Sequence, residues 1–293
     1  MLFQWYPGHM TKTKRMMQEN IKLIDVVIEL VDARVPLSSK NPDIDQIAGN
    51  KPRIILINKY DLADPNYTKL WEAYYRSKGF HTCLLNSKQT KEVEKVKNLI
   101  FEVCKERIER NRRRGMINKP IRAMIVGIPN VGKSTFINSI AKKASAKTGN
   151  RPGVTKGKQW IRINKDIELL DTPGILWPKF EDQQVALNLA FIGAIKDDIL
   201  DIITLSYKFI EHMETVSPLA IKNRYKIEVE KSDTSVTIFE KIARKRGFII
   251  SGGEIDELRT AQILFDEFRG GKLGYISVET PENMQDGGSY DDR

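Results

Sequence analysis

The 293-residue chain carries a formal net charge of +10 and contains two cysteines, Cys83 and Cys104. Two cysteines exclude a disulfide framework and a cysteine-rich metal cluster, and they suit a reducing compartment. The first ten residues lack the charged and apolar pattern of a secretory signal, and no run is apolar enough to cross a bilayer. We therefore expect a cytoplasmic protein with no membrane partner.

The positive charge is concentrated in two stretches. Residues 105–122 hold eight basic and two acidic side chains, and residues 141–165 hold eight basic side chains and no acid. Such concentrations attract nucleic acids, because binding releases the counterions of the phosphates. A solvated basic surface that only keeps the protein soluble would have the same composition, so charge alone leaves both interpretations open.

Strand and helix patterns alternate along roughly the first 170 residues. Continuous apolar runs of this kind are typical of parallel strands that are covered on both faces. The alternation predicts an α/β domain with a mostly parallel sheet and helices on both faces. In chain order, we expect strands over 25–31, 53–57, 82–85, 123–126, 160–163 and 167–170, and helices over 67–78, 91–113 and 133–142.

The pattern changes after about residue 177. Helical spacing continues over 182–210, 236–246 and 255–269, and no convincing strand occurs between them. We expect an α/β domain over residues 1–178 and a smaller all-α domain over 179–278. Residues 279–293 are polar and acidic, and this composition predicts a disordered tail.

A phosphate-binding loop is predicted between the fourth strand and the next helix. The segment Gly127-Ile128-Pro129-Asn130-Val131-Gly132-Lys133-Ser134 fits the pattern G-x-x-x-x-G-K-[ST] in the required strand–loop–helix context. Its backbone amides and the helix N-terminus attract phosphate oxygens. We expect Lys133 to reach the β- and γ-phosphates and Ser134 to bind Mg²⁺, with Val131, Gly132 and Thr135 also against the nucleotide.

A second nucleotide motif follows the last strand. Asp171-Thr172-Pro173-Gly174 matches D-x-x-G, in which the Asp holds Mg²⁺ through water and the amide of Gly174 contacts the γ-phosphate. The loop at residues 149–157 is typical of a switch that GTP orders. Within it, Thr155 is our candidate for the threonine that closes over Mg²⁺, and Thr148 is the alternative.

The base-reading motif stands much earlier in the chain. Asn58-Lys59-Tyr60-Asp61 fits N-K-x-D, and the carboxylate of Asp61 can accept from both N1–H and the exocyclic amine of guanine. Adenine offers no matching pair of donors, so the motif predicts selectivity for GTP and GDP. The short run Asn86-Ser87-Lys88 follows the next strand and fits the last loop that contacts guanine.

The order of these motifs is circularly permuted. In ordinary GTPases the phosphate loop comes first and N-K-x-D follows D-x-x-G, whereas here N-K-x-D and the serine loop come first. The contacts are preserved if the former termini are joined, and residues 91–119 would make that connection. The segment after Gly174 then leads directly into the helical half. Nucleotide state could therefore move that half.

The chain resembles the YlqF/RbgA family of ribosome biogenesis GTPases over nearly its whole length. The motifs that carry this resemblance are WYPGHM (5–10), VDARVPLSS (31–39), NKYD, GIPNVGKS, RPGVT, DTPG and FRGGKLG (268–274). The resemblance implies a GTPase that acts in assembly of the large ribosomal subunit, with its precursor particle and ribosomal RNA as partners and with no DNA partner. On this resemblance, we expect the α/β domain over 1–178 to be the permuted GTPase domain and the all-α domain over 179–278 to bind RNA or the ribosome. A GTPase that acts on another RNA, and a nucleotide-dependent binding module with negligible turnover, are the alternatives.

The residues that would catalyse hydrolysis are the least defined. Ile175 stands where many GTPases have the Gln that orients the attacking water, so unaided hydrolysis should be slow. His9, expected in a Pro-Gly-His loop near the D-x-x-G end, is our candidate for positioning water, and packing or capping is its alternative role. Asn130 either ligates K⁺ beside the phosphates or only favours the loop. Arg34 and Arg151 are further candidate cations.

Overall fold

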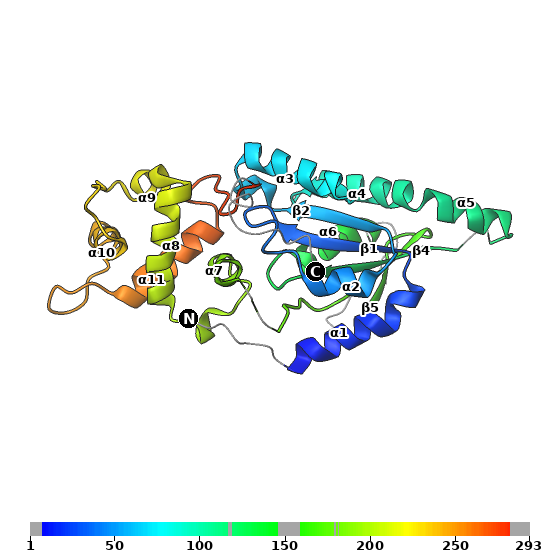
Figure 1. Ribbon diagram of the computed structural model, residues 1–293, viewed down its shortest axis with the longest axis horizontal. Coiled ribbons are helices and arrows are strands. Elements are labelled where there is room, and N and C mark those ends of the chain that lie inside the picture. Colours follow the sequence, from blue (N-terminus) through cyan, green and yellow to red (C-terminus); the bar gives the residue numbers. More distant parts are fainter. Residues whose placement is uncertain (1–7, 117–118, 146–158, 179, 181, 282–293) are drawn as a thin grey trace.

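The computed structural model describes residues 8–116, 119–145, 159–178, 180 and 182–281. Its first half contains one sheet with the strand order β3-β2-β1-β4-β6-β5 (Figure 1). All neighbours pair in parallel except β5, which runs antiparallel to β6 at one edge. The strands are β1 (Val26–Asp32), β2 (Arg53–Asn58), β3 (His81–Leu85), β4 (Ile121–Gly127), β5 (Gln159–Arg162) and β6 (Ile167–Asp171).

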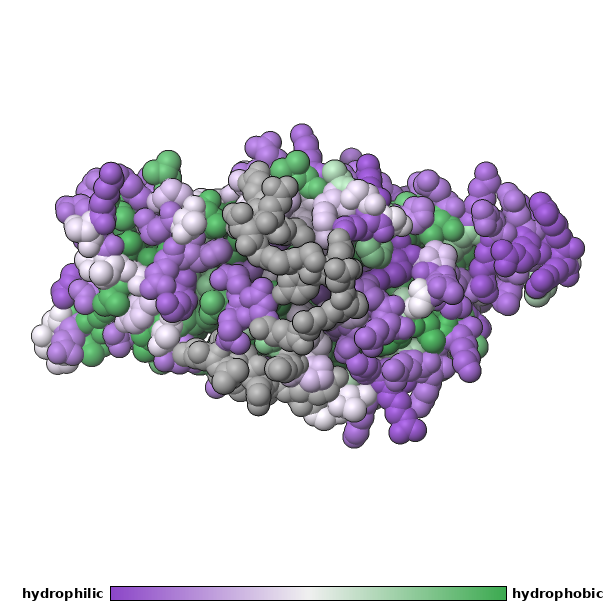
Figure 2. Space-filling view, viewed as in Figure 1, coloured by the Kyte–Doolittle hydropathy of each residue, from purple (hydrophilic) through white to green (hydrophobic). Residues whose placement is uncertain are grey.

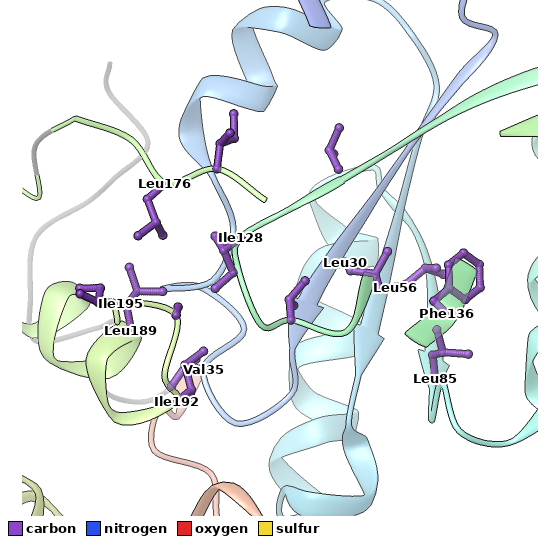
Figure 3. Packing of buried hydrophobic residues seen from close by; sticks show 14 of the residues in the cluster. Leu30, Val35, Leu56, Leu85, Ile128, Phe136, Leu176, Leu189, Ile192 and Ile195 are labelled. Atoms are coloured by element: carbon purple, nitrogen blue, oxygen red, sulfur yellow. The ribbon is translucent and has the colours of Figure 1, made fainter. Parts of the chain in front are cut away.

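Helices cover both faces of this sheet, which confirms the expected fold class. Because successive strand residues point to opposite faces, Ile57 packs against Trp71 of α3 on one side. On the other side Leu56 packs with Phe136 of α6 (Figure 3). The helices of this half are α1 (Gly8–Asn20), α2 (Pro42–Ala48), α3 (Pro65–Ser77), α4 (Thr90–Val103), α5 (Lys105–Arg113) and α6 (Lys133–Ser145), with short 3₁₀ turns η1 (Ile21–Leu23) and η2 (Tyr60–Leu62).

The central strand β1 is buried along its whole length, including its two carboxylates Glu29 and Asp32. Burial raises the pKa of Glu29, and the charge of Arg53, with which it is ion-paired, acts against this rise. Glu29 also accepts from the backbone N–H of Asn41 at 3.0 Å. Buried charges require such partners, so this strand is fixed by polar contacts as well as by apolar packing.

Two helices of the first half were not expected from the sequence. Asn41 caps α2 by accepting from the backbone N–H of Asp43 at 2.9 Å, and Pro42 fills the first helical position. Helix α1 begins at Gly8 and buries Met10 and Met17. The prediction that Pro-Gly-His forms a loop is therefore wrong for its last two residues, because Gly8 and the backbone of His9 form the first turn of this helix.

The second half of the described chain is helical, except for one isolated antiparallel bridge between Ile249 and Ile255. Its centre is an aromatic cluster in which the ring of Phe209 lies 4.8 Å from that of Phe268 and 5.2 Å from that of Phe191. No described helix meets the length and apolarity needed for a membrane span. The elements are α7 (Gln183–Phe191), η3 (Asp197–Ile199), α8 (Ile202–Val216), α9 (Pro218–Tyr225), α10 (Ser235–Arg246) and α11 (Glu257–Arg269).

The two halves share one apolar core. Leu176, Leu189 and Ile192 lie in the same buried cluster as Ile128 and Val35, beside the end of β4 (Figure 3). The helical half therefore packs against the loops at the carboxyl end of the sheet, where the nucleotide motifs lie. A movement of those loops would therefore displace α7, because the two share buried apolar contacts.

The chain returns to the first half at its C-terminal end. The backbone N–H of Ile276 donates to Leu62 O at 3.0 Å, and that of Val278 donates to Arg34 O at 2.9 Å. The carboxylate of Glu279 accepts from the backbone N–H groups of Leu37 and Ser38 at 2.7 and 3.1 Å. Glu279, which we assigned to the acidic tail, is thus a partly buried part of the fold.

Candidate nucleotide-binding site

The loop between β4 and α6 has the backbone that a phosphate-binding loop requires. Gly127 has φ of 147° and Gly132 has φ of 102°, values that side chains rarely allow. A Cβ at Gly127 would lie 2.7 Å from Leu30 O, and one at Gly132 would overlap the side-chain amide of Asn58. Glycine is therefore needed for close approach to the neighbouring strand and to the base-reading motif.

Lys133 begins α6 and points back into this loop. Its Nζ donates to the backbone carbonyls of Gly127 and Ile128 at 2.9 and 2.8 Å. Burial lowers the pKa of Lys133 to about 8, although the charge of Asp171 acts against this shift. The ammonium lies where the loop would place phosphates, and a less solvated cation attracts an anion more strongly.

The D-x-x-G segment lies against the phosphate loop. A Cβ at Gly174 would lie 2.8 Å from both Lys133 Nζ and Pro129 N. Burial raises the pKa of Asp171, and the charge of Lys133 opposes this rise. Ser134 and Thr135 are exposed on the first turn of α6. A hydroxyl of Ser134 and the carboxylate of Asp171 are oxygen donors of the kind that Mg²⁺ prefers.

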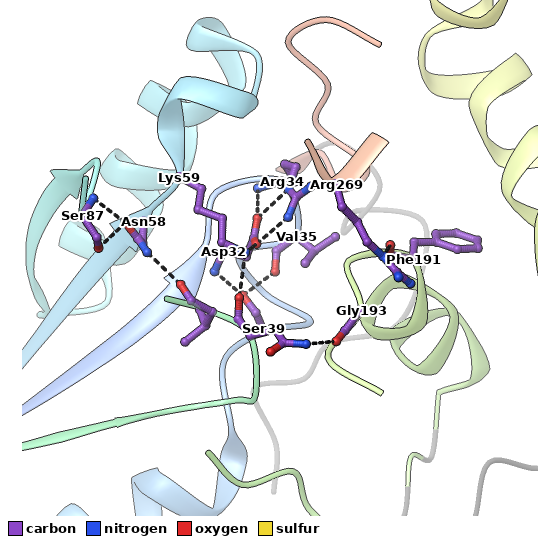
Figure 4. Close-up of polar contacts among 12 residues, drawn as sticks. Asp32, Arg34, Val35, Ser39, Asn58, Lys59, Ser87, Phe191, Gly193 and Arg269 are labelled. Atoms are coloured by element: carbon purple, nitrogen blue, oxygen red, sulfur yellow. Dashed lines mark hydrogen bonds and ion pairs between the residues drawn. The ribbon is translucent and has the colours of Figure 1, made fainter. Parts of the chain in front are cut away.

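Asn58 joins three loops that are far apart in the sequence (Figure 4). Its Nδ2 donates to Val131 O of the phosphate loop at 2.7 Å. Its Oδ1 accepts from the backbone N–H of Ser87 at 3.1 Å and from Ser87 Oγ at 2.8 Å. Asn86 closes the serine loop by accepting from the backbone N–H of Lys88 at 3.0 Å. The structure therefore brings together the two base-reading loops and the phosphate loop.

Lys59 is a second link to the phosphate loop. Its backbone is left-handed, with φ of 60°, and its Nζ donates to Asn130 O at 2.7 Å and to Asp32 at 2.8 Å. The next turn, η2, presents Asp61, which is partly exposed and has no hydrogen-bond partner in the described part of the chain. Its carboxylate is thus available to accept from a base.

An ion pair behind Lys59 was not predicted. Asp32 accepts from Arg34 Nε and Nη2 at 2.9 and 2.8 Å, and both side chains are buried (Figure 4). Burial alone would raise the pKa of Asp32, but the charges of Arg34 and Lys59 outweigh it and hold that pKa far below its ordinary value. Arg34 also lies over the ring of Phe268 at 5.1 Å. It is 1% exposed, so it is a structural cation and not a free catalytic one.

The phosphate loop also contacts the helical half. Asn130 has a left-handed φ of 58°, which Asn tolerates well, and its Nδ2 donates to Gly193 O at 2.5 Å (Figure 4). Arg269 secures this turn by donating to Ala190 O and Phe191 O at 2.9 and 3.0 Å. The candidate potassium ligand is therefore held by the segment after α7.

Ile175, directly after Gly174, is fully buried. Its backbone N–H donates to Gly127 O at 3.4 Å, and its carbonyl accepts from Asn41 Nδ2 at 3.1 Å. The side chain thus packs in the core and cannot orient water. The switch segment with Thr148, Arg151 and Thr155 lies outside the described residues, as does the side chain of His9.

Comparison with known proteins agrees with this geometry. A family model described as "50S ribosome-binding GTPase" matches residues 122–240, beginning at the strand before the phosphate loop. "Ribosome biogenesis GTPase A" of Bacillus cereus is 49% identical over 97% of this chain and 96% of its own length. Its namesake in Thermotoga maritima is 31% identical over 96% and 95%.

Solved structures extend the similarity to the fold. A GDP-bound structure of YlqF matches 92% of this chain and 100% of its own with a TM-score of 0.68 at 27% identity. A GNP-bound YlqF from T. maritima matches 92% and 99% with a TM-score of 0.65 at 28% identity. The identity over almost the full length, together with the permuted motif order, shows that the chain belongs to the YlqF/RbgA family of circularly permuted ribosome biogenesis GTPases.

Proposed function

We propose that this protein is a GTP-hydrolysing switch that acts in the cytoplasm in assembly of the large ribosomal subunit. In its GTP state it binds precursor particles and ribosomal RNA, and hydrolysis releases it. The observation that carries this proposal is the position of Asn58, which donates to Val131 O at 2.7 Å and accepts from Ser87 Oγ at 2.8 Å. The base-reading and phosphate-binding groups therefore face one site.

The phosphates and the base of the nucleotide are bound at opposite ends of this site. The amides of the phosphate loop and Lys133 hold the phosphates, while Asp61 reads guanine. Substitution Asp61→Asn should weaken GTP binding about 100-fold or more, because two charge-assisted hydrogen bonds are lost. Fluorescence titration with GTP and ATP analogues tests this. If ATP competes equally well with GTP on the unaltered protein, the assignment of the base-reading loop is wrong.

Mg²⁺ fits the donors at the phosphate end. The described residues contain no cluster of three or more His, Cys, Asp and Glu side chains, so protein ligands alone would not enclose an ion. Ser134 and Asp171 supply one hydroxyl and one carboxylate, and Mg²⁺ prefers to complete its shell with phosphate oxygens and water. Thr155 is the proposed third protein group. The bound ion neutralises charge on the β- and γ-phosphates.

Hydrolysis requires a group that positions water, because Ile175 is buried and apolar. We assign this role to His9, whose backbone lies in the first turn of α1. Substitution His9→Ala should leave GTP affinity unchanged and remove the turnover stimulated by ribosomal particles. Normal stimulated turnover in this variant would exclude His9 from the mechanism. A K⁺ ion beside Asn130 is the proposed fixed positive charge of the transition state.

Nucleotide state can reach the helical half through two described contacts. Asn130 Nδ2 donates to Gly193 O, and Lys59 joins the phosphate loop to Asp32. Asp32 in turn holds Arg34, whose carbonyl accepts from Val278. Hydrogen exchange in the GDP form and with a non-hydrolysable GTP analogue should therefore differ in residues 182–281. Equal exchange would show that the helical half does not respond.

The ribosomal role is tested by co-sedimentation with large-subunit precursor particles. We expect retention with a non-hydrolysable GTP analogue and release with GDP. GTPase rates with and without the particles should show slow basal turnover and clear stimulation. Absence of both nucleotide-dependent retention and stimulation would refute the proposed function. Stimulation by an unrelated RNA alone would point to a different RNA target.

A further inference from the structure

Helix α5 carries a dense group of exposed basic side chains. We call Lys105, Arg110, Arg112, Arg113 and Arg114 the α5 basic surface, and all five are exposed. The helix continues the line of α4 and extends past the sheet (Figure 1), and this end of the molecule is strongly hydrophilic (Figure 2). No family motif considered above falls in this segment, so the nucleotide site does not account for these residues.

One side of α5 is anchored and the rest is left to solvent. Arg107 is ion-paired with Asp25, which also accepts from the backbone N–H of Arg122 at 3.1 Å. Ile108 packs against the apolar core, but no residue of the helix is fully buried. Arg107 and Ile108 therefore fix the position of α5, and the five cations of the α5 basic surface are not needed to stabilise the fold.

The cations of the α5 basic surface have no ion-pair partners among the described residues, although Glu106 and Glu109 lie on the same helix. Arg224 and Arg246 of the helical half differ in this respect, because both are ion-paired with Glu267. Arg246 pairs with Glu267 at 3.0 Å and lies over the ring of Tyr225 at 5.1 Å. The unpaired arginines of α5 are thus free to neutralise charge on a partner.

Phosphate groups are the ligands that best match the cations of the α5 basic surface. Four of its five cations are arginines, whose guanidinium groups bind phosphate oxygens in pairs and stack on bases. Arg110, Arg113 and Arg114 are three and four residues apart, so they share one side of the helix. A membrane surface fits poorly, because the apolar Ile108 packs inward and leaves no apolar face to insert.

We propose that the α5 basic surface binds the phosphate backbone of ribosomal RNA, a partner that rests on the proposed function. The surface lies near the amino ends of β1 and β4, where Asp25 and Arg122 hold α5, whereas the nucleotide motifs follow the carboxyl ends of these strands. The contact is therefore separate from the nucleotide site. It contributes equally in the GTP and GDP forms.

The test is the salt dependence of binding to a labelled fragment of large-subunit ribosomal RNA. The variant Arg110→Gln/Arg113→Gln/Arg114→Gln should bind about ten- to 100-fold more weakly at ~0.1 M salt. The slope of log K against log salt should fall in magnitude by about 2 to 3, since each lost phosphate contact contributes about 0.7 to 0.9. Affinity for a fluorescent GTP analogue and basal turnover should not change.

Two controls make the result specific. The variant Lys69→Gln/Lys95→Gln/Lys231→Gln removes the same charge from scattered exposed positions and should keep most of the slope. Substitution of the same three arginines by Lys should keep the slope and lose only part of the affinity. An unchanged slope and affinity in the α5 Gln variant overturns the proposal, even if the unaltered protein binds particles in a GTP-dependent way. Loss of particle binding with unchanged RNA binding also overturns it and indicates an acidic protein partner.

Discussion

Substitution Asp32→Asn removes the negative charge that Arg34 and Lys59 share, while keeping the volume of the side chain. Asp32 is 0% exposed and Arg34 is 1% exposed, so solvent cannot replace the lost charge. The guanidinium would remain buried beside Phe268 without its carboxylate. An uncompensated buried charge is costly, whereas removing both partners of a buried pair is tolerated far better.

The expected loss of unfolding free energy is about 3 to 5 kcal/mol, the cost of breaking a buried pair from one side. At about 2 to 4 °C per kcal/mol, this corresponds to a fall in Tm of about 6 to 20 °C. Lys59 also loses its anchor, so GTP affinity should fall about ten- to 100-fold, the range for one charge-assisted hydrogen bond. Because the charges of Arg34 and Lys59 lower the pKa of Asp32, its stabilisation is complete above about pH 4 and is lost only as the pH falls towards the folded pKa.

Urea denaturation and thermal unfolding without nucleotide measure the effect. Glu19→Gln is the matched control, because its pair with Arg15 is 61% and 82% exposed and should change stability by less than about 0.5 kcal/mol. The double variant Asp32→Asn/Arg34→Met should recover a large part of the loss. A loss below about 1 kcal/mol in the single variant, or no recovery in the double variant, would refute this reasoning.

Three further outcomes follow from the site. Burial lowers the pKa of Lys133 to about 8, so its charge is lost above that pH in the free protein, and the Kd for a fluorescent GTP analogue should rise about tenfold between pH 7 and pH 9; a flat profile would contradict this. Gly271→Ala places a Cβ 2.6 Å from the terminal Cδ2 methyl of Leu62, whereas Gly274→Ala meets open space at a similarly positive φ, so thermal unfolding should show an extra loss of about 0.5 to 1.5 kcal/mol for Gly271→Ala, the cost of moving that side chain from its preferred rotamer. If Asn130 ligates K⁺, turnover should be faster in K⁺ than in Na⁺ and Asn130→Ala should abolish the difference; equal rates in the unaltered protein would exclude the ion.

The sheet and the assembly of the motifs could be predicted because both follow from local patterns. Short apolar runs identified all six strands, and each nucleotide motif directly follows one of them. Carboxyl ends of parallel strands meet at one edge of a sheet, so the approach of Asn58 to Val131 follows from the topology. Since the base-reading motif comes before the phosphate loop in the chain, residues 91–119 had to connect the former termini of an ordinary GTPase domain.

The contacts missed by the sequence analysis join residues that are far apart in the chain. No periodicity shows that Val278 pairs with Arg34 or that Gly271 packs on Leu62. Helix α1 was missed for a different reason: Pro-Gly signals a turn, but the burial of Met10 outweighs that signal. In each case tertiary packing decided the conformation, and packing is not encoded within a short window.

The return of the C-terminal segment to η2 has a consequence for synthesis of the protein. During translation the base-reading loop is made first, the phosphate loop follows, and Ile276, whose backbone N–H donates to Leu62 O, is made after both. A chain that has not yet been extended to Ile276 therefore lacks this contact with η2. The turn that presents Asp61 thus gains this support only after both nucleotide-binding loops have been made.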